Sequence, residues 1–118
     1  MPYRLNKAYR LKDGRLYAGS GNAEDCAAVR IWLESGGEKP KIENYAGIVI
    51  GADGSIWRYE DKLVPLHVSG PFHATGSGRD YAMAAMHMGK SAREAVELAC
   101  VYDIYTGGPI TEITLGHD

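Results

Sequence analysis

The stretch that decides the fold reads FHATGSGRDYAMAAMHMGKSAREAVELACVYD and covers residues 72–103. Its pattern predicts a short strand over 72–75, a glycine turn at 76–78 and a helix over 79–88. A second helix is expected to begin near residue 91, after a short break. A strand that turns sharply into two consecutive helices indicates that these helices cover one side of a sheet.

Three residues define the boundaries of these two helices. Gly89 suits a C-terminal cap for the first helix, because glycine adopts the required backbone angles without a steric penalty. Ser91 and Glu94 have the S-x-x-E spacing of a capping box, in which each side chain accepts a hydrogen bond from an unpaired backbone N–H. The faces expected to be buried are rich in alanine: Tyr81, Ala84, Ala85 and Met88 in the first helix, and Ala92, Ala95, Val96 and Ala99 in the second.

The chain before this stretch alternates hairpins with a helix. Two Asp-Gly pairs predict tight hairpin turns, and an apolar run at 46–50 predicts a strand buried on both faces. Gly19-Ser20-Gly21-Asn22 is interpreted as a loop that enters a helix ending at Gly36-Gly37, with Asn22 as its cap. The expected elements are strands at 7–11, 16–18, 46–50, 56–59, 63–68 and 110–115, and a helix from 22 to 35 whose apolar face is Cys26, Val29, Trp32 and Leu33.

Length and element order define the architecture. The 118 residues are enough for one domain with a real core, so a single domain over 1–118 is expected. Helices separated along the chain by antiparallel strands predict an α+β layered sandwich.

Composition argues against several classes of function. The net charge of −2 does not indicate a nucleic-acid-binding surface, and no apolar run is long enough to span a membrane. The two cysteines are expected to be reduced thiols in a cytoplasmic protein. The four histidines, His67, His73, His87 and His117, lack the spacing of metal ligands, so neither a metal nor a cofactor is expected.

Beyond these patterns, the chain carries a family resemblance. The order of motifs in this stretch resembles the second half of a proteasome β-type subunit. The motifs are the strand, the Gly-Ser-Gly turn, Asp-Tyr-Ala, the alanine-rich helix, Ser-Ala-Arg-Glu and the later Asp-Ile-Tyr-Thr. The peptidase subunit of the bacterial two-component protease (HslV) and its small bacterial and phage or prophage relatives are the most similar. The resemblance covers residues 7 to 118. It implies the N-terminal-nucleophile hydrolase fold, a layered αββα sandwich of two antiparallel sheets between helices.

The resemblance also implies positions for an active site. In this family an N-terminal threonine is the nucleophile and its own amine is the base. Lys7 matches the lysine that lowers the pKa of the nucleophile. Gly21, in the Gly-Ser-Gly of residues 19–21, matches the backbone N–H donor to the oxyanion, and Ser77 matches the serine that supports the amine. Each of the three also has an ordinary interpretation: an exposed strand lysine, a plain loop glycine and a polar turn residue.

The nucleophile has no match in this sequence. Only the six residues MPYRLN precede Lys7, where the family has two further strands, the catalytic threonine and an aspartate. The chain is therefore expected to be an N-terminally truncated version of the fold. It is either a partial copy of a longer threonine endopeptidase, a catalytically inactive relative that acts in binding or assembly, or a subunit whose partner donates the missing strands.

An incomplete sandwich has consequences for association. Loss of two strands exposes sheet edges, which invite pairing with another chain, and an apolar layer, which invites association. We therefore expect the chain to self-associate, as a dimer or a ring, through the exposed region of the sheet, with a further protein partner as the alternative.

Overall fold

The computed structural model describes residues 8–75 and 78–102. Five of its elements are strands that form one antiparallel sheet in the order β1-β2-β3-β4-β5, so each strand pairs with its neighbour along the chain. Tight turns at Gly14 (φ +93°) and Gly54 (φ +85°) close the first two hairpins, as the Asp-Gly pairs predict. The strands are β1 (Ala8–Arg10), β2 (Leu16–Gly21), β3 (Tyr45–Ile50), β4 (Ile56–Tyr59) and β5 (Leu66–Val68).

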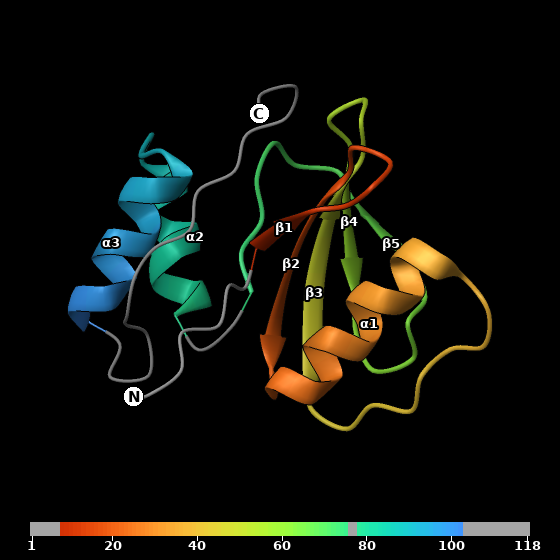
Figure 1. Ribbon diagram of the computed structural model, residues 1–118. Helices are drawn as coiled ribbons and strands as arrows, with labels where there is room; N and C mark the ends of the chain where they lie inside the picture. Colours follow the sequence, from red (N-terminus) through yellow and green to blue (C-terminus); the bar gives the residue numbers. More distant parts are fainter. Residues whose placement is uncertain (1–7, 76–77, 103–118) are drawn as a thin grey trace.

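Helix α1 (Ala23–Ser35) covers one face of the sheet (Figure 1). The side chain of Asn22 caps its first turn by accepting a hydrogen bond from the Asp25 N–H at 2.8 Å, and Gly36 (φ +72°) ends it. Both boundaries confirm the prediction from the sequence. The buried core under α1 is made by residues of the helix, the sheet and the turns: Leu11, Tyr17, Val29, Tyr45, Val49, Tyr59 and Leu63, with Cys26, Trp32 and Leu33 packed against them.

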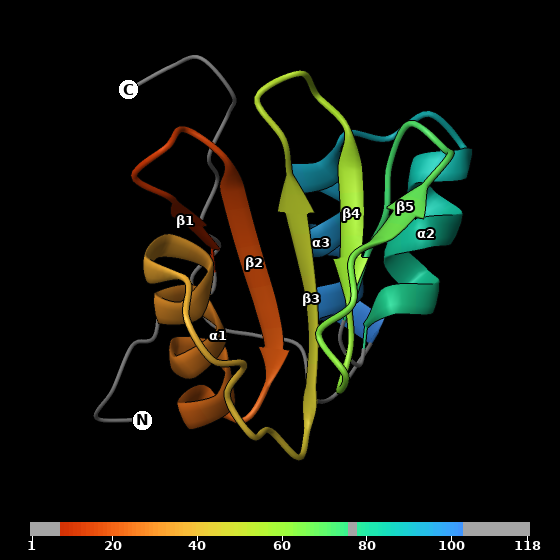
Figure 2. The ribbon, with the colours of Figure 1, turned by 90° about the vertical axis from the view of Figure 1, so that its right-hand side faces the viewer.

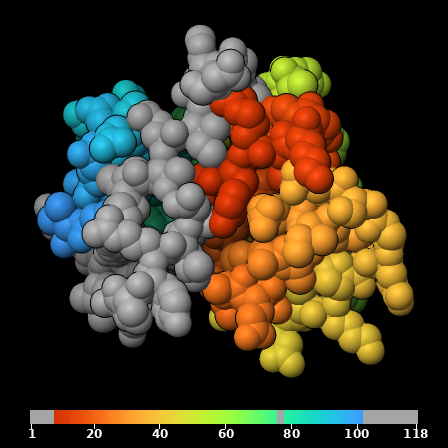
Figure 3. All heavy atoms as spheres, in the orientation of Figure 1, coloured from red at the N-terminus to blue at the C-terminus, as the bar shows by residue number. Residues whose placement is uncertain are grey.

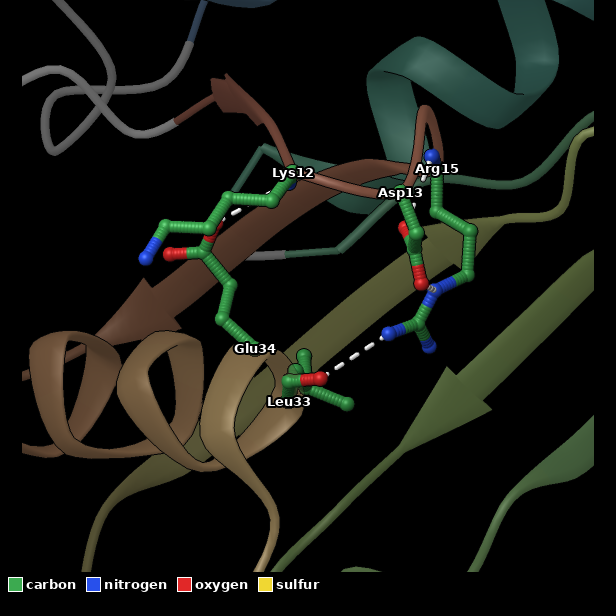
Figure 4. Close-up of polar contacts among 5 residues, drawn as sticks. All are labelled: Lys12, Asp13, Arg15, Leu33 and Glu34. Carbon is green, nitrogen blue, oxygen red and sulfur yellow. Dashed lines mark hydrogen bonds and ion pairs between the residues drawn. The ribbon is translucent and has the colours of Figure 1, made fainter.

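The β1–β2 hairpin is fixed to the C-terminal half of α1 by polar contacts (Figure 4). The backbone N–H of Lys12 donates to Glu34 Oε2 at 3.0 Å. Arg15 donates from Nη2 to the carbonyl of Leu33 at 2.9 Å and forms an ion pair with Asp13 at 2.7 Å. In the space-filling view the hairpin and α1 adjoin on the same face of the molecule (Figure 3). These contacts hold β1, a strand of only three residues, on the edge of the sheet.

Strand β2 is longer than the sequence suggests. Residues 19–21, interpreted above as a loop, continue the strand and pair with residues 45–47 of β3. The glycines are what permit this pairing, because a Cβ at Gly19 would lie 2.5 Å from the hydroxyl of Tyr17 and a Cβ at Gly47 would collide with the ring of Tyr45. The loop prediction is therefore wrong, since these glycines serve close packing within a strand.

Helices α2 (Arg79–His87) and α3 (Ala92–Tyr102) pack against each other on the other side of the sheet from α1 (Figures 1 and 2). The capping box is present, with Ser91 N–H donating to Glu94 Oε1 at 3.0 Å and Glu94 N–H donating to Ser91 Oγ at 3.1 Å. The shared core of the pair is made by Ala82, Ala85, Met86 and Ala95.

The buried face of α2 is rotated relative to the one predicted. Tyr81 and Met88 are 43% and 84% exposed, and Ala84 is exposed as well. Ala82 and Met86 lie inward with Ala85 instead. On α3 the buried residues are Ala95 and Ala99, while Ala92 and Val96 are exposed. Small side chains at the helix–helix contact let the two backbones approach closely, which decides the choice of face.

The two cores are separate. Within the described residues, no Cα of α2 or α3 comes within 8 Å of a Cα of any strand. The segment that joins them is Phe72–Thr75, which is not a regular strand, so the prediction of a strand there is wrong. Phe72 and Ala74 pack against the α2–α3 core, whereas Thr75 is hydrogen-bonded to β2 through Ser20. Alternate residues of this segment thus bind opposite layers, as expected of an extended chain.

The fold class predicted from the sequence is confirmed at the level of an α+β arrangement, with an antiparallel sheet between helices. The described elements supply one sheet. The second sheet of the predicted sandwich is not among them, and the strand predicted at 110–115 lies outside the described residues.

Candidate functional site

The end of strand β2 holds the one predicted site residue that the structure describes, Gly21. Its φ angle of +112° is one that residues with a side chain rarely adopt. A Cβ added there would collide with the carbonyl group of Asn44. Position 21 is therefore restricted to glycine by both backbone angle and space.

The backbone N–H of Gly21 points away from β3. Gly21 is the register partner of Tyr45, and the next bond of the ladder runs from Asn22 N–H to the Asn44 carbonyl at 3.1 Å. In an antiparallel ladder this places Gly21 and Tyr45 in a pair that does not exchange hydrogen bonds. The N–H of Gly21 is thus directed to the side of β2 on which β1 lies. The first described residue of β1, Ala8, pairs with Ala18, so the described part of β1 ends before it reaches Gly21. The N–H of Gly21 is therefore not used in the β2–β3 ladder. An oxyanion donor has to meet this condition.

Beside Gly21, two hydroxyl groups join the sheet to the chain that leads into α2. Ser20 Oγ lies 3.0 Å from Thr75 Oγ1 and also donates to the carbonyl of Ala46 at 3.2 Å. Side chains alternate between the two faces along a strand. Tyr17 and its register partner Val49 pack under α1. Ser20, three residues after Tyr17, therefore lies on the face of the sheet opposite α1. Among the described residues, neither hydroxyl is hydrogen-bonded to a carboxylate or an imidazole. The pair is thus a structural link with no attached base.

The other two predicted residues, Lys7 and Ser77, lie outside the described residues. Their described neighbours in the sequence both contact strand β2. Ala8, which follows Lys7, pairs with Ala18 of β2, and Thr75, two residues before Ser77, is hydrogen-bonded to Ser20. The fold therefore brings two distant segments of the chain to β2, at Ala18 and at Ser20.

Charged groups on this same face of the sheet were not singled out by the sequence. Arg58 of β4 is the register partner of Ile48 and Leu66, and it stands on an otherwise apolar part of the face. Burial lowers the pKa of His73, and the positive charges of Arg58 and Arg79 lower it further. The alternation of side chains along β4 is the feature of the sequence that indicates this position. It places Ile56 and Arg58 on one face of the sheet and Trp57 and Tyr59 on the other.

Behind β2, a buried pair of tyrosines supports the strand from the side of α1. The hydroxyls of Tyr17 and Tyr45 lie 2.8 Å apart, and Tyr17 also donates to the carbonyl of Cys26 at 3.2 Å. Burial raises the pKa of both phenols, so both are neutral at physiological pH. They stabilise the strand and offer no base.

Two other features are absent from the part of the chain that the structure describes. No group of three or more His, Cys, Asp or Glu side chains there is arranged to hold a metal ion. None of the helices in that part of the chain has the length and apolar character needed to cross a membrane.

Comparison with known proteins gives a consistent result for the fold. No protein-family model matches the sequence, and no curated protein shows significant sequence similarity to it. Several solved structures are similar in fold, including the following two. The Thiobacillus denitrificans BPH, solved in complex with epoxomicin, has a TM-score of 0.64 and 19% identity, over 88% of this chain and 75% of that one. The eukaryotic HslV from Trypanosoma brucei has a TM-score of 0.62 and 17% identity, over 86% of this chain and 75% of that one.

At these identities the likeness bears on the fold, and the fold alone. It agrees with the five-stranded antiparallel sheet and three helices described above. The chain therefore has an α+β fold similar to that of the BPH and HslV structures.

Proposed function

We propose that these 118 residues form a proteasome β-like domain that acts in binding or assembly, without a catalytic threonine of its own. In this proposal the domain retains the supporting part of a peptidase site, with Gly21 as the oxyanion donor and with Lys7 and Ser77 beside it. It does not supply the group that attacks a peptide bond.

The observation that carries the proposal is the arrangement around Gly21. Its N–H is directed out of the β2–β3 ladder. Ala8, which follows Lys7, pairs with Ala18, and Thr75, two residues before Ser77, is hydrogen-bonded to Ser20, so both neighbours contact β2 within three residues of Gly21. The hydroxyls present there, Ser20 and Thr75, are hydrogen-bonded to each other and to a carbonyl. A hydroxyl without an adjacent base is a weak nucleophile.

The alternative is that this sequence is part of a longer threonine-type endopeptidase of the HslV and proteasome kind. The position of Gly21 favours this alternative to the same extent, because an oxyanion donor has a function only where a nucleophile is supplied. The two proposals differ in a single respect, namely the presence of a reactive threonine in the native protein.

Intact-mass measurement of the untagged protein from its native source separates them. The proposal predicts a mass equal to the chain that begins at Met1 or Pro2, together with no hydrolysis of fluorogenic peptides. A heavier protein with an N-terminal threonine and with peptidase activity would refute it and establish the endopeptidase. In that case Gly21→Ala is expected to reduce kcat, because alanine keeps the backbone N–H but cannot hold the φ angle and the close approach to Asn44 that orient it.

A further inference from the structure

The face of the sheet that carries α1 has a hollow near the last turn of the helix. Its volume is about 270 Å³, it is open to solvent, and it lies where β2, β3, β4 and the chain that enters β5 come together. Helix α1 ends nearby, because one of the lining side chains, that of Arg15, is bonded to the carbonyl of Leu33. The described residues that line the hollow are Arg15, Val49, Gly51, Trp57, Tyr59 and Pro65.

Two aromatic side chains give the hollow an apolar wall. Trp57 is held by a hydrogen bond from its Nε1 to Ser55 Oγ at 2.9 Å, and its ring centroid lies 4.9 Å from that of His67. The ring of Tyr59 packs edge-on against Trp32 at 6.4 Å between centroids. Both rings are therefore fixed before a ligand arrives, which lowers the entropic cost of binding. A fixed aromatic wall of this kind suits another aromatic ring.

The polar part of the wall is a guanidinium that is also fixed. Arg15 Nε is paired with Asp13 Oδ2 at 2.7 Å, and Nη2 donates to the carbonyl of Leu33 at 2.9 Å (Figure 4). A guanidinium has five N–H donors, and these two bonds use two of them. Arg15 can therefore donate a further hydrogen bond to an acceptor in the hollow while it keeps both of its present partners.

The charges around the hollow favour a neutral ligand. Asp13 already balances Arg15, and Asp53 Oδ1 lies beside Gly51, since a Cβ at Gly51 would come within 2.8 Å of it. Hydrogen bonds from Arg15 and Ser55 lower the pKa of Asp13 and of Asp53 respectively, so both carboxylates are ionised at neutral pH. An anion in the hollow would meet two carboxylates against one guanidinium, whereas a cation would contact Arg15 itself.

We propose that this hollow binds a neutral aromatic ring that carries a carbonyl group, as in an aromatic amide. The ring would lie against Trp57 and Tyr59, and the carbonyl oxygen would accept a hydrogen bond from Arg15. The site includes neither Gly21 nor the positions of Lys7 and Ser77. The inference is therefore independent of which function proposed above is correct.

An NMR titration of the indole N–H groups tests the proposal, with benzamide as the probe. The chain has two tryptophans, so labelled protein gives two indole signals, and Trp57→Phe assigns them. Benzamide is expected to shift the signal of Trp57 with saturation, while the backbone signals of α3, on the other side of the sheet, stay in place. The shift of the Trp57 signal measures the affinity.

Two compounds separate the parts of the ligand. Benzoate keeps the ring but adds a negative charge, so it is expected to bind about threefold more weakly than benzamide. Cyclohexanecarboxamide keeps the carbonyl but lacks the aromatic ring, and it is expected to bind about threefold to tenfold more weakly.

Two variants test the donor. Arg15→Lys keeps the positive charge but loses the planar guanidinium, so it is expected to weaken the binding of benzamide about threefold or more. Arg30→Lys is the matched control, because Arg30 is also ion-paired and its side chain is 33% exposed against 28% for Arg15. Arg30 does not line the hollow, so this change is expected to leave the affinity unchanged.

Several outcomes would overturn the inference. The absence of a saturable shift of the Trp57 signal would show that benzamide is not bound. Equal or tighter binding of benzoate would show that a neutral ligand is not preferred, and equal binding of cyclohexanecarboxamide would show that the rings recognise nothing. Unchanged affinity in a folded Arg15→Lys variant would exclude Arg15 as the donor. The three compounds are compared on the unmodified protein, so the question is decided even where a variant fails to fold.

Discussion

At the scale of single residues, Gly21 is the position at which sequence, fold and proposed site meet. Its backbone angle and its contact with the Asn44 carbonyl each exclude a side chain. Its N–H is directed away from β3, and the same geometry that requires glycine is what orients this donor.

Gly21→Ala is expected to lower the free energy of unfolding by about 2–3 kcal/mol, because alanine is strained at this φ and its Cβ meets the Asn44 carbonyl. Gly54→Ala is the matched control, since Gly54 also has a positive φ (+85°) but open space around it, so only the strain is added. Urea unfolding of both variants measures the difference. Equal losses in the two variants would show that the close approach to Asn44 has no energetic weight.

The tyrosine pair behind β2 predicts how stability depends on alkaline pH. Burial raises the pKa of Tyr17 and Tyr45 in the folded protein, whereas unfolded tyrosines ionise near 10. Above about pH 10 the unfolded chain binds fewer protons than the folded one, so stability falls as the pH rises. Below that pH the contribution is fully present.

Tyr45→Phe tests this directly. The variant is expected to lose about 1 kcal/mol at pH 7, the usual net value of one hydrogen bond, while Tyr17 keeps its bond to the Cys26 carbonyl. Its stability is expected to fall less steeply than that of the unmodified protein between pH 9 and 11. Parallel pH profiles from thermal unfolding would contradict the account.

At the scale of elements, Asp25 links the start of α1 to the chain that enters β3. Its Oδ2 accepts hydrogen bonds from the N–H groups of Glu43 and Asn44 at 2.8 and 3.0 Å and from Asn22 Nδ2 at 3.2 Å. The bonds from Glu43 and Asn44 lower its pKa most. Protonation would weaken all three bonds, so the link is expected to fail in acid.

Asp25→Asn is expected to destabilise the protein at pH 7, and the loss is expected to shrink as the pH falls. The sign follows from linkage: the folded pKa lies below the unfolded value near 3.9, so the stabilisation is present above that value and is lost as the pH falls through the folded pKa. Thermal unfolding between pH 7 and 3 measures it. Asp61→Asn, which removes an exposed carboxylate in a turn, is the control, and a constant difference between Asp25→Asn and the unmodified protein at all pH values would refute the prediction.

The elements also show how far a sequence can be interpreted. Helix α1, the two Asp-Gly hairpins and the capping box at Ser91 follow from local rules of caps and turns, and all are present. The loop predicted at 19–21 is wrong, because these residues pair with β3. The strand predicted at 72–75 is wrong as well, and this segment is bonded to the sheet through Thr75 and Ser20. Both are contacts between distant parts of the chain, which local patterns do not indicate. The buried face of α2 depended on α3 for the same reason. Of the candidate site, Gly21 was identified by family resemblance, and Arg58 and His73 required the fold.

At the scale of the whole molecule, the edge of the sheet at β5 is exposed. β5 has three residues and ends the order of strands in the described sheet, and Val64 and Leu66 are 49% and 41% exposed. An edge strand with apolar neighbours favours pairing with another chain.

We propose that a second copy of this chain binds there. Light scattering at tens of micromolar protein is expected to give a dimer or larger assembly. Leu66→Lys, which places a charge on the edge, is expected to shift the assembly toward monomer. Ile31→Lys changes an apolar residue of α1 that is more exposed than Leu66 (55% against 41%) and is expected not to shift it. A monomer in the unmodified protein would contradict the proposal.

The central claim is that this fold carries the support of a peptidase site without its reacting group. The most direct measurement is the intact mass of the 118-residue chain after incubation with epoxomicin. The similar BPH structure was solved in complex with this compound. The BPH from Thiobacillus denitrificans, which was solved in that complex, is measured beside it under conditions that preserve complexes. The account predicts an unchanged mass for this chain, and an increase by the mass of one epoxomicin would contradict it.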